Sequence, residues 1–243
     1  MRIFIATSRP EHAVDEYVEW SVQRARENFR AHGHEAMPWR PYSYLYVDKA
    51  RNDLTRIALG CGADAILYWD ADQTVHCAPE QDLAALFNCG PVVGAAYCSR
   101  QEPAKYCVTE LAEKGARWVT AAMMGERRAP FSAYWIGTGA LWVRREVFDR
   151  FPFPWFMSGY GGDGQYRGED VFFCEQLRAA GVPILCQPGI STGHMITGML
   201  CHRPGGTLEG MPPGVTDAYE QFRVRAGDAV QAAERGRCRG EPT

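Results

Sequence analysis

Two hydrophobic periods alternate along the first hundred residues, one typical of buried strands and one typical of amphipathic helices. Strands are predicted at 2–6, 34–37, 65–69 and 91–96. Helices are predicted between them at 11–31, 48–59 and 79–87, the second with Asp48 as an acidic N-cap and the third with Pro79 in its first turn. This order predicts an α/β fold, in which helices cover both faces of a mostly parallel sheet.

The second half of the chain has a more mixed pattern. Short strands and loops are predicted at 97–136, a buried strand after a glycine turn at 137–143, a short helix at 145–150, a helix at 169–180 and a strand at 184–187. Residues 155–168 are rich in glycine and aromatic residues, which is typical of a mobile loop. We therefore expect one domain over 1–202, made of halves 1–96 and 97–202. A linker and a helix at 217–235 that packs on the domain are expected in 203–243.

Composition and charge narrow the class of protein. The chain has 243 residues and a formal net charge of -3, so no global field favours nucleic acid or an anionic membrane. No apolar run approaches the roughly 20 residues that a membrane helix needs, and the N-terminus does not resemble a signal peptide. The 9 cysteines include no Cys-x-x-Cys pair. We expect a cytoplasmic protein with reduced thiols, of unknown oligomeric state.

The predicted strand at 65–69 ends in two carboxylates, Asp70 and Asp72. On extended backbone these side chains would point to the same side, because strand side chains alternate. Two like charges beside a buried strand are costly unless a cation lies between them. Oxygen ligands suit Mg²⁺ or Mn²⁺, an ion that is commonly shared with a substrate phosphate. The alternative is a solvated turn that merely ends the strand.

Five short segments, in this order, resemble the GT-A glycosyltransferases, a Rossmann-like α/β family that binds nucleotide-sugars through Asp-x-Asp. They are Ala50-Arg51-Asn52, the 62–72 strand with its two acids, Thr138-Gly139-Ala140, Gly168-Glu169-Asp170 and Gly193-His194-Met195. The resemblance covers residues 2–196 and is greatest to the inverting, family-2-like enzymes. It implies a GT-A sheet with a smaller mixed region on the acceptor side.

The resemblance also implies a donor site. Asp72 would bind the metal directly, with Asp70 holding the ribose or a metal-bound water, and His194 would be a further metal ligand that favours Mn²⁺ over Mg²⁺. The nucleotide would lie against Thr7, Ser8 and Arg9 and near Gly139, and Arg51 would contact the diphosphate. The donor would be a nucleoside-diphosphate sugar, with a UDP-sugar expected first. For His194 the alternative to a metal ligand is a hydrogen-bonded loop histidine. For Arg51 the alternative to a diphosphate contact is a surface ion pair.

Asp170 and Glu169 are the expected catalytic acids. By resemblance to inverting enzymes, Asp170 would remove the proton of the acceptor hydroxyl, and Glu169 would bind donor or acceptor hydroxyls. Acids are also favoured at helix N-termini for electrostatic reasons alone. Some retaining relatives pair Asp-x-Asp with a late histidine, so the stereochemistry stays open. The aromatic residues of 155–168 would close over the acceptor.

The expected activity is therefore metal-dependent transfer of a hexose or pentose to a hydroxyl of a saccharide, small molecule or polymer. One variant of this hypothesis places the acceptor hydroxyl on a hydroxymethylated DNA base, with phosphates bound by arginines at 127, 128, 144, 145 and 167. A nucleotidyltransferase is disfavoured, because no glycine-rich phosphate loop follows the first strand. A non-catalytic sugar-binding module would not need Asp72, Asp170 and His194 together.

Overall fold

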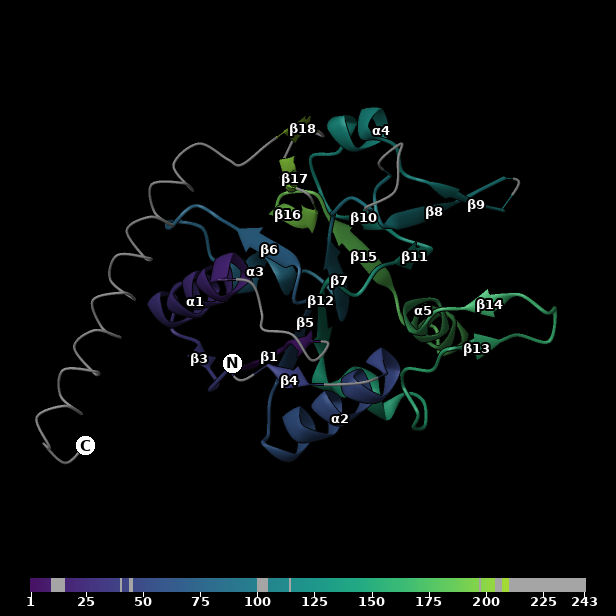
Figure 1. Cartoon of the computed structure of the whole chain (residues 1–243), viewed down its shortest axis with the longest axis horizontal. Helices are drawn as coiled ribbons and strands as arrows, with labels where there is room; N and C mark the ends of the chain where they lie inside the picture. The colour runs from purple at the N-terminus through teal and green to yellow at the C-terminus, as the bar shows by residue number, and fades with distance from the viewer. Residues whose placement is uncertain are drawn as a thin grey trace, which may run out of the picture. The chain divides into compact units, whose positions relative to one another are not determined.

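A seven-stranded sheet forms the centre of the fold in this computed structural model (Figure 1). Its strands, in spatial order, are β10 (Phe131–Ser132), β15 (Ile184–Gln187), β7 (Val92–Ala95), β12 (Ala140–Arg144), β5 (Ala65–Trp69), β1 (Arg2–Ala6) and β3 (Glu35–Ala36). The strands β12 and β10 run against the others. The predicted α/β fold with a mostly parallel sheet is confirmed, although the reversed β12 separates β5 from β7.

The structure describes residues 1–9, 16–39, 41–43, 46–99, 105–113, 115–196, 198–203 and 207–209. They belong to one compact unit, Met1–Gly210. The second unit, Met211–Thr243, contains the helix predicted at 217–235 and lies outside the described residues.

Helices cover both faces of the central sheet (Figure 1). On one face α1 (Glu16–Ala31) and α3 (Leu83–Phe87) pack over Leu67 and Trp69 of β5. On the other face α2 (Val47–Gly60) and α5 (Glu169–Ala179) pack over Ile66 and Tyr68. Alternate side chains of β5 therefore enter two separate cores, which explains why every residue of this strand is apolar.

Smaller sheets flank the centre. One contains β18 (Thr207–Glu209), β17 (Gly198–Arg203), β16 (Ser191–Ile196) and β6 (Gln73–His76), and another contains β11 (Trp135–Ile136), β8 (Val108–Ala112) and β9 (Gly115–Trp118). Two strand pairs, β2 (Ser8–Arg9) with β4 (Tyr42–Ser43) and β13 (Gly159–Tyr160) with β14 (Tyr166–Arg167), complete the strands. A short helix, α4 (Ala121–Glu126), and a 3-10 helix at Arg145–Asp149 complete the described elements.

Two predicted helix starts are wrong. The helix expected from Pro79 begins at Leu83, because Asp82 is the N-cap and its carboxylate accepts from the amide of Ala85 at 3.1 Å. The N-cap of α2 is Tyr46 rather than Asp48. The carboxylate of Asp48 instead accepts from the amide of Ser158 at 3.1 Å and so holds the segment before β13 against α2.

The segment predicted as a loop over 155–168 has a defined structure. The ring of Phe156 is buried and stacks on Phe173 of α5 with centroids 4.5 Å apart. The side chain of Asn52 accepts from the amides of Trp155 and Phe156 at 3.0 and 3.2 Å and donates to the carbonyl of Phe156. Beyond it, β13 and β14 form a hairpin. Phe156 therefore belongs to the core and is not a residue that faces an acceptor.

Two further expectations concern thiols and membranes. The seven cysteines whose side chains the structure describes are all free thiols. Within the described residues, none of the helices has the length and apolar character required to cross a membrane.

We expect Phe156→Ala to lower the free energy of unfolding by about 3–5 kcal/mol, because it removes a fully buried aromatic ring. The neighbouring Met157 is 46% exposed, so Met157→Ala is the matched control and should change stability by about 0.5 kcal/mol or less. Chemical denaturation measures both. Equal losses from the two variants would contradict the buried position of Phe156.

Candidate active site

The chain turns sharply where β5 ends. The carbonyl of Asp70 accepts from the amide of Gln73 at 3.0 Å, and the amide of Asp70 donates to the carbonyl of Gly139 at 3.0 Å. The backbone from 70 to 73 is therefore a turn rather than an extended strand. The expectation that alternation aligns Asp70 with Asp72 is wrong for this reason, and the two carboxylates have different partners.

Asp70 pairs with a buried arginine. The guanidinium of Arg51, on α2, lies 2.7 Å from Oδ1 of Asp70 and also bonds Glu169 at the start of α5. Its side chain is 4% exposed, so the alternative of a surface ion pair is wrong. Burial by itself lowers the pKa of Arg51, but Asp70, together with Asp170 and Tyr97, opposes that effect and the pKa is raised. Arg51 therefore stays charged and joins α2, the turn after β5 and α5 at one point.

Asp72 faces His194 instead. The Oδ2 atom of Asp72 lies 3.6 Å from Nε2 of His194, which is on β16. The other ring nitrogen, Nδ1, lies 2.6 Å from the carbonyl oxygen of Cys98, a distance at which a protonated Nδ1 donates a hydrogen bond. That bond orients the imidazole with Nε2 toward Asp72. The amide of Met195 also donates to the carbonyl of Asp72 at 2.8 Å, which holds the turn beside β16.

The side chains that could bind a metal here match only part of the predicted metal site. A carboxylate and an imidazole that face each other suit a divalent cation such as Mn²⁺. Among the described residues, however, no group of three histidine, cysteine or acidic side chains could hold a metal ion. Asp70 is bonded to Arg51, so the predicted trio of Asp70, Asp72 and His194 is not assembled. Asp72 and His194 fit as a pair, with the remaining positions left to water or substrate oxygens.

Asp170 lies beside this cluster at the start of α5. Burial raises the pKa of its carboxyl, and the positive charge of Arg51 opposes that rise. Its Oδ1 accepts from the amide of Val171 at 2.7 Å. The N-cap of α5 is Gly168, which makes no side-chain capping bond. Neither acid is therefore the N-cap residue: Glu169 pairs with Arg51, and Asp170 is held in a partly desolvated position.

Tyr97 is a part of the site that the sequence analysis missed. Its hydroxyl accepts from the amide of Gly139 at 3.1 Å, and its ring packs edge-on against His194 with centroids 5.8 Å apart. A Cβ atom at Gly139 would lie 2.9 Å from Tyr97 Cζ, so only glycine fits this position. Tyr97 follows the apolar run of β7 and reads as an ordinary core residue. The sequence contains no signal that would distinguish it.

The residues predicted to read the nucleotide lie at the end of β1. The side-chain oxygen of Thr7 accepts from the indole nitrogen of Trp39 at 2.9 Å. The backbone carbonyl of Thr7 accepts from the amide of Tyr42 at 2.8 Å. Ser8 and Arg9 form β2 and pair with β4. Ser8 is buried and Arg9 is half-buried. Nucleotide contact by Thr7, Ser8 and Arg9 stays a prediction.

The arginines considered for DNA phosphates contact the protein itself. Each of them donates to a side chain or carbonyl of this chain: Arg127 to Glu110, Arg128 to Gly125, Arg144 to Asn88, Arg145 to Leu59 and Arg167 to Asp163 and Glu175. No observation in the described part of the chain favours the nucleic-acid variant over a saccharide, small-molecule or other polymer acceptor.

Comparison with solved structures supports the fold. A197 from STIV is 17% identical, with a TM-score of 0.59 over 87% of this chain and 95% of its own. A mutant of Drosophila β-1,4-galactosyltransferase 7, solved with manganese, UDP-Gal and xylobiose, is 14% identical, with a TM-score of 0.43 over 76% of this chain and 64% of its own. A glycosyltransferase involved in glycosylation of the major capsid of PBCV-1 is 12% identical, with a TM-score of 0.34 over 63% of this chain and 69% of its own. No protein-family model and no curated protein matches the chain.

The similarity to A197 spans most of both chains and shows a shared fold. Together with the sheet order, it confirms the expected α/β fold, a mostly parallel sheet with helices on both faces, which is consistent with a GT-A, Rossmann-like arrangement. Identities this low show the fold alone, so the activity has to be argued from the site.

We expect Arg51→Met to lower the free energy of unfolding by about 3–5 kcal/mol, because it leaves two carboxylates without their buried partner. Arg24 forms an ion pair with Glu27 in which both side chains are at least half exposed. Arg24→Met is therefore the control and should cost about 1 kcal/mol or less. Denaturation of the two variants in parallel measures the difference, and similar small costs would refute a structural role for the Arg51 pairs.

Proposed function

We propose that the protein is a metal-dependent glycosyltransferase that moves a sugar from a nucleoside-diphosphate sugar to a hydroxyl acceptor. One observation carries the proposal: Asp70 and Asp72 leave the carboxyl end of β5 in a turn that joins Asp70, through Arg51, to Glu169 and places Asp72 against His194. Open α/β sheets bind their ligands at this end of the strands. Asp72 and His194 also supply a carboxylate and an imidazole, which are ligands that suit a divalent cation.

Asp72 and His194 are the residues that would hold the cation. Bound there, a divalent cation would act as a Lewis acid and stabilise the charge that develops on the diphosphate leaving group. Asp70 uses Oδ1 for Arg51, so Oδ2 is the atom that we expect to accept a hydroxyl of the ribose. Arg51 is already bonded to two carboxylates, and we assign it a positioning role in addition to any contact with the diphosphate.

Asp170 is the residue that we propose as the general base. Its carboxylate takes the proton of the acceptor hydroxyl while that oxygen bonds to the anomeric carbon of the sugar. The bond from this carbon to the diphosphate oxygen breaks at the same time, and the nucleoside diphosphate leaves. This route inverts the anomeric centre. Glu169, held by Arg51, lies next to Asp170 in the chain, and we assign it the binding of a sugar hydroxyl.

Release of nucleoside diphosphate tests the activity. The protein is incubated with each common nucleotide-sugar, UDP-sugars first, with and without Mn²⁺ and with a broad mixture of acceptors. We expect release with at least one donor and a loss of about 100-fold or more in Asp72→Asn, because a metal ligand contributes several kcal/mol to charge stabilisation.

The exposed Asp149 has no role in the site, so Asp149→Asn is the matched control and should release product at the wild-type rate. Equal rates in Asp72→Asn and Asp149→Asn would overturn the assignment of Asp72 as a metal ligand. No release with any donor would overturn the proposal that the protein is a glycosyltransferase.

The pH dependence tests Asp170. A base works only when it is ionised, so the transfer rate should fall as the pH falls through the raised pKa of Asp170, at a higher pH than an ordinary aspartate would give. We expect Asp170→Asn to lower transfer by about 10²–10⁴-fold, to abolish this acid limb, and to leave donor binding intact. An unchanged rate in Asp170→Asn would remove the residue from the mechanism.

Stability offers a second readout for the same residue. A carboxyl whose pKa is raised by folding destabilises the native state once it ionises. Asp170→Asn should therefore melt above the wild type at neutral pH, and the difference should vanish below the ordinary pKa of aspartate. A melting difference that does not change with pH would contradict the burial of this carboxyl.

A further inference from the structure

Exposed apolar side chains concentrate in one segment of the described chain. Among the nine large apolar residues that are exposed, four lie between 153 and 166: Phe153, Met157, Tyr160 and Tyr166. Tyr160 and Tyr166 have 80% and 63% of their surface exposed. Apolar groups that gather on the surface commonly mark a binding site.

Tyr160 and Tyr166, called here the tyrosine pair, lie directly opposite each other in the β13–β14 hairpin. Directly paired residues of antiparallel strands project from the same face of the ladder. The two ring centroids are 5.4 Å apart and the ring planes meet at 75°. The pair therefore presents two aromatic surfaces at an angle, and neither ring is packed into a core.

The hairpin that carries the tyrosine pair is braced from within. The guanidinium of Arg167 donates to both carboxylate oxygens of Asp163 at 2.8 and 2.9 Å and, through Nε, to Glu175 of α5 at 3.0 Å. The amide of Gly161 donates to the carbonyl of Gln165 at 2.9 Å and closes the loop. A hairpin backbone braced in this way needs little ordering when it binds a ligand.

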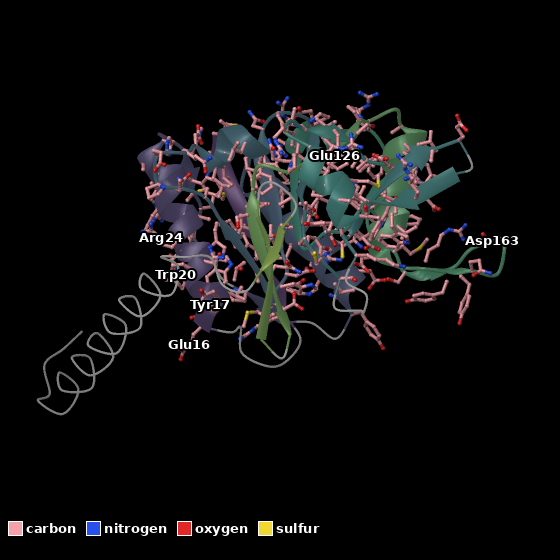
Figure 2. All side chains as sticks on the ribbon, turned by 90° about the horizontal axis from the view of Figure 1, so that it is seen from above. Glu16, Tyr17, Trp20, Arg24, Glu126 and Asp163 are labelled. Carbon is pink, nitrogen blue, oxygen red and sulfur yellow. The ribbon has the colours of Figure 1, made fainter. Side chains whose placement is uncertain are left out.

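The tyrosine pair adjoins the candidate active site along the chain. Strand β14 leads through Gly168 directly into α5, so Tyr166 precedes Asp170 by only four residues. Four residues of extended chain span at most about 14 Å, so the pair cannot lie far from Asp170. Figure 2 shows Asp163, at the tip of the hairpin, at the opposite end of the described unit from the labelled residues of α1. In Figure 1 the hairpin projects beyond α5, on the side away from the central sheet.

Local charge distinguishes between possible ligands. From 153 to 175 the chain carries four carboxylates, Asp163, Glu169, Asp170 and Glu175, and a single cation, Arg167. The cation is already bonded to two of the carboxylates. Nucleic-acid sites need cations for phosphates, so this surface repels a polyanion. A neutral saccharide has the complementary chemistry, because the C–H face of its ring packs on an aromatic face and its hydroxyls donate to carboxylates.

We propose that the tyrosine pair is the platform on which a neutral saccharide acceptor docks, with its reacting hydroxyl directed toward Asp170. The inference rests on the proposed function and deepens it, because it assigns the acceptor to uncharged saccharides rather than to DNA.

Acceptor kinetics and direct binding test the platform together. Neutral gluco- and xylo-oligosaccharides and single-stranded DNA are the probes, and saccharide binding is measured by NMR without any donor. We expect Tyr160→Ala and Tyr166→Ala each to weaken saccharide binding and raise the acceptor KM by about 3- to 10-fold, as the loss of one aromatic contact predicts. The donor KM and the melting temperature should not change. Tyr160→Phe, which keeps the ring, should bind like the wild type.

Leu111 provides the matched control, because it is 71% exposed and lies on β8, outside the hairpin. Leu111→Ala should change none of these quantities. Saccharide binding that depends on the tyrosines, without release from any donor, would leave the platform intact and refute the proposed function. Transfer with an unchanged acceptor KM, preferential binding of DNA, or a change only in oligomeric state by light scattering would each overturn the platform.

Discussion

The buried guanidinium of Arg51 is the interaction on which the site depends. Removing a charge from water costs several kcal/mol, and the cost is recovered only where opposite charges meet it with good geometry. Asp70 and Glu169 meet this requirement from two different elements, the turn after β5 and the start of α5. Because α2 carries the arginine, one side chain fixes the relative positions of three elements that are far apart in the sequence.

This arrangement leaves the site with an excess of negative charge. Asp70 and Glu169 share one arginine, and Asp72 and Asp170 add two further carboxyls beside it. The surplus charge favours a divalent cation on the side of Asp72. On the other side, burial raises the pKa of Asp170, and the charge of Asp70 adds to that rise. A neutral acceptor can approach such a site from the hairpin, whereas a polyanion is repelled. The same charges thus support both the proposed cation and the proposed acceptor class.

Much of the fold could be predicted from local patterns. The strands β1, β5, β7, β12 and β15 and the helices α2 and α5 lie where the hydrophobic periods placed them, because each buries an apolar face that is visible in the sequence. The errors occurred where a polar side chain serves a distant partner. Asp48 resembles an N-cap but binds the amide of Ser158, and Phe156 resembles a loop aromatic but stacks on Phe173.

The sequence by itself determined the α/β class of fold and the position of Asp70 and Asp72 at the end of a buried strand, since periodicity is a local property. The candidates Asp170 and His194 came from the resemblance of short segments to a known family. Only the tertiary structure decided the partners. It turned the backbone after Trp69, directed Asp70 to Arg51 and Asp72 to His194, and enclosed Gly139 beneath Tyr97. Those choices depend on contacts between residues far apart in the sequence, such as Asp72 and His194, and no local pattern encodes the free energy of such contacts.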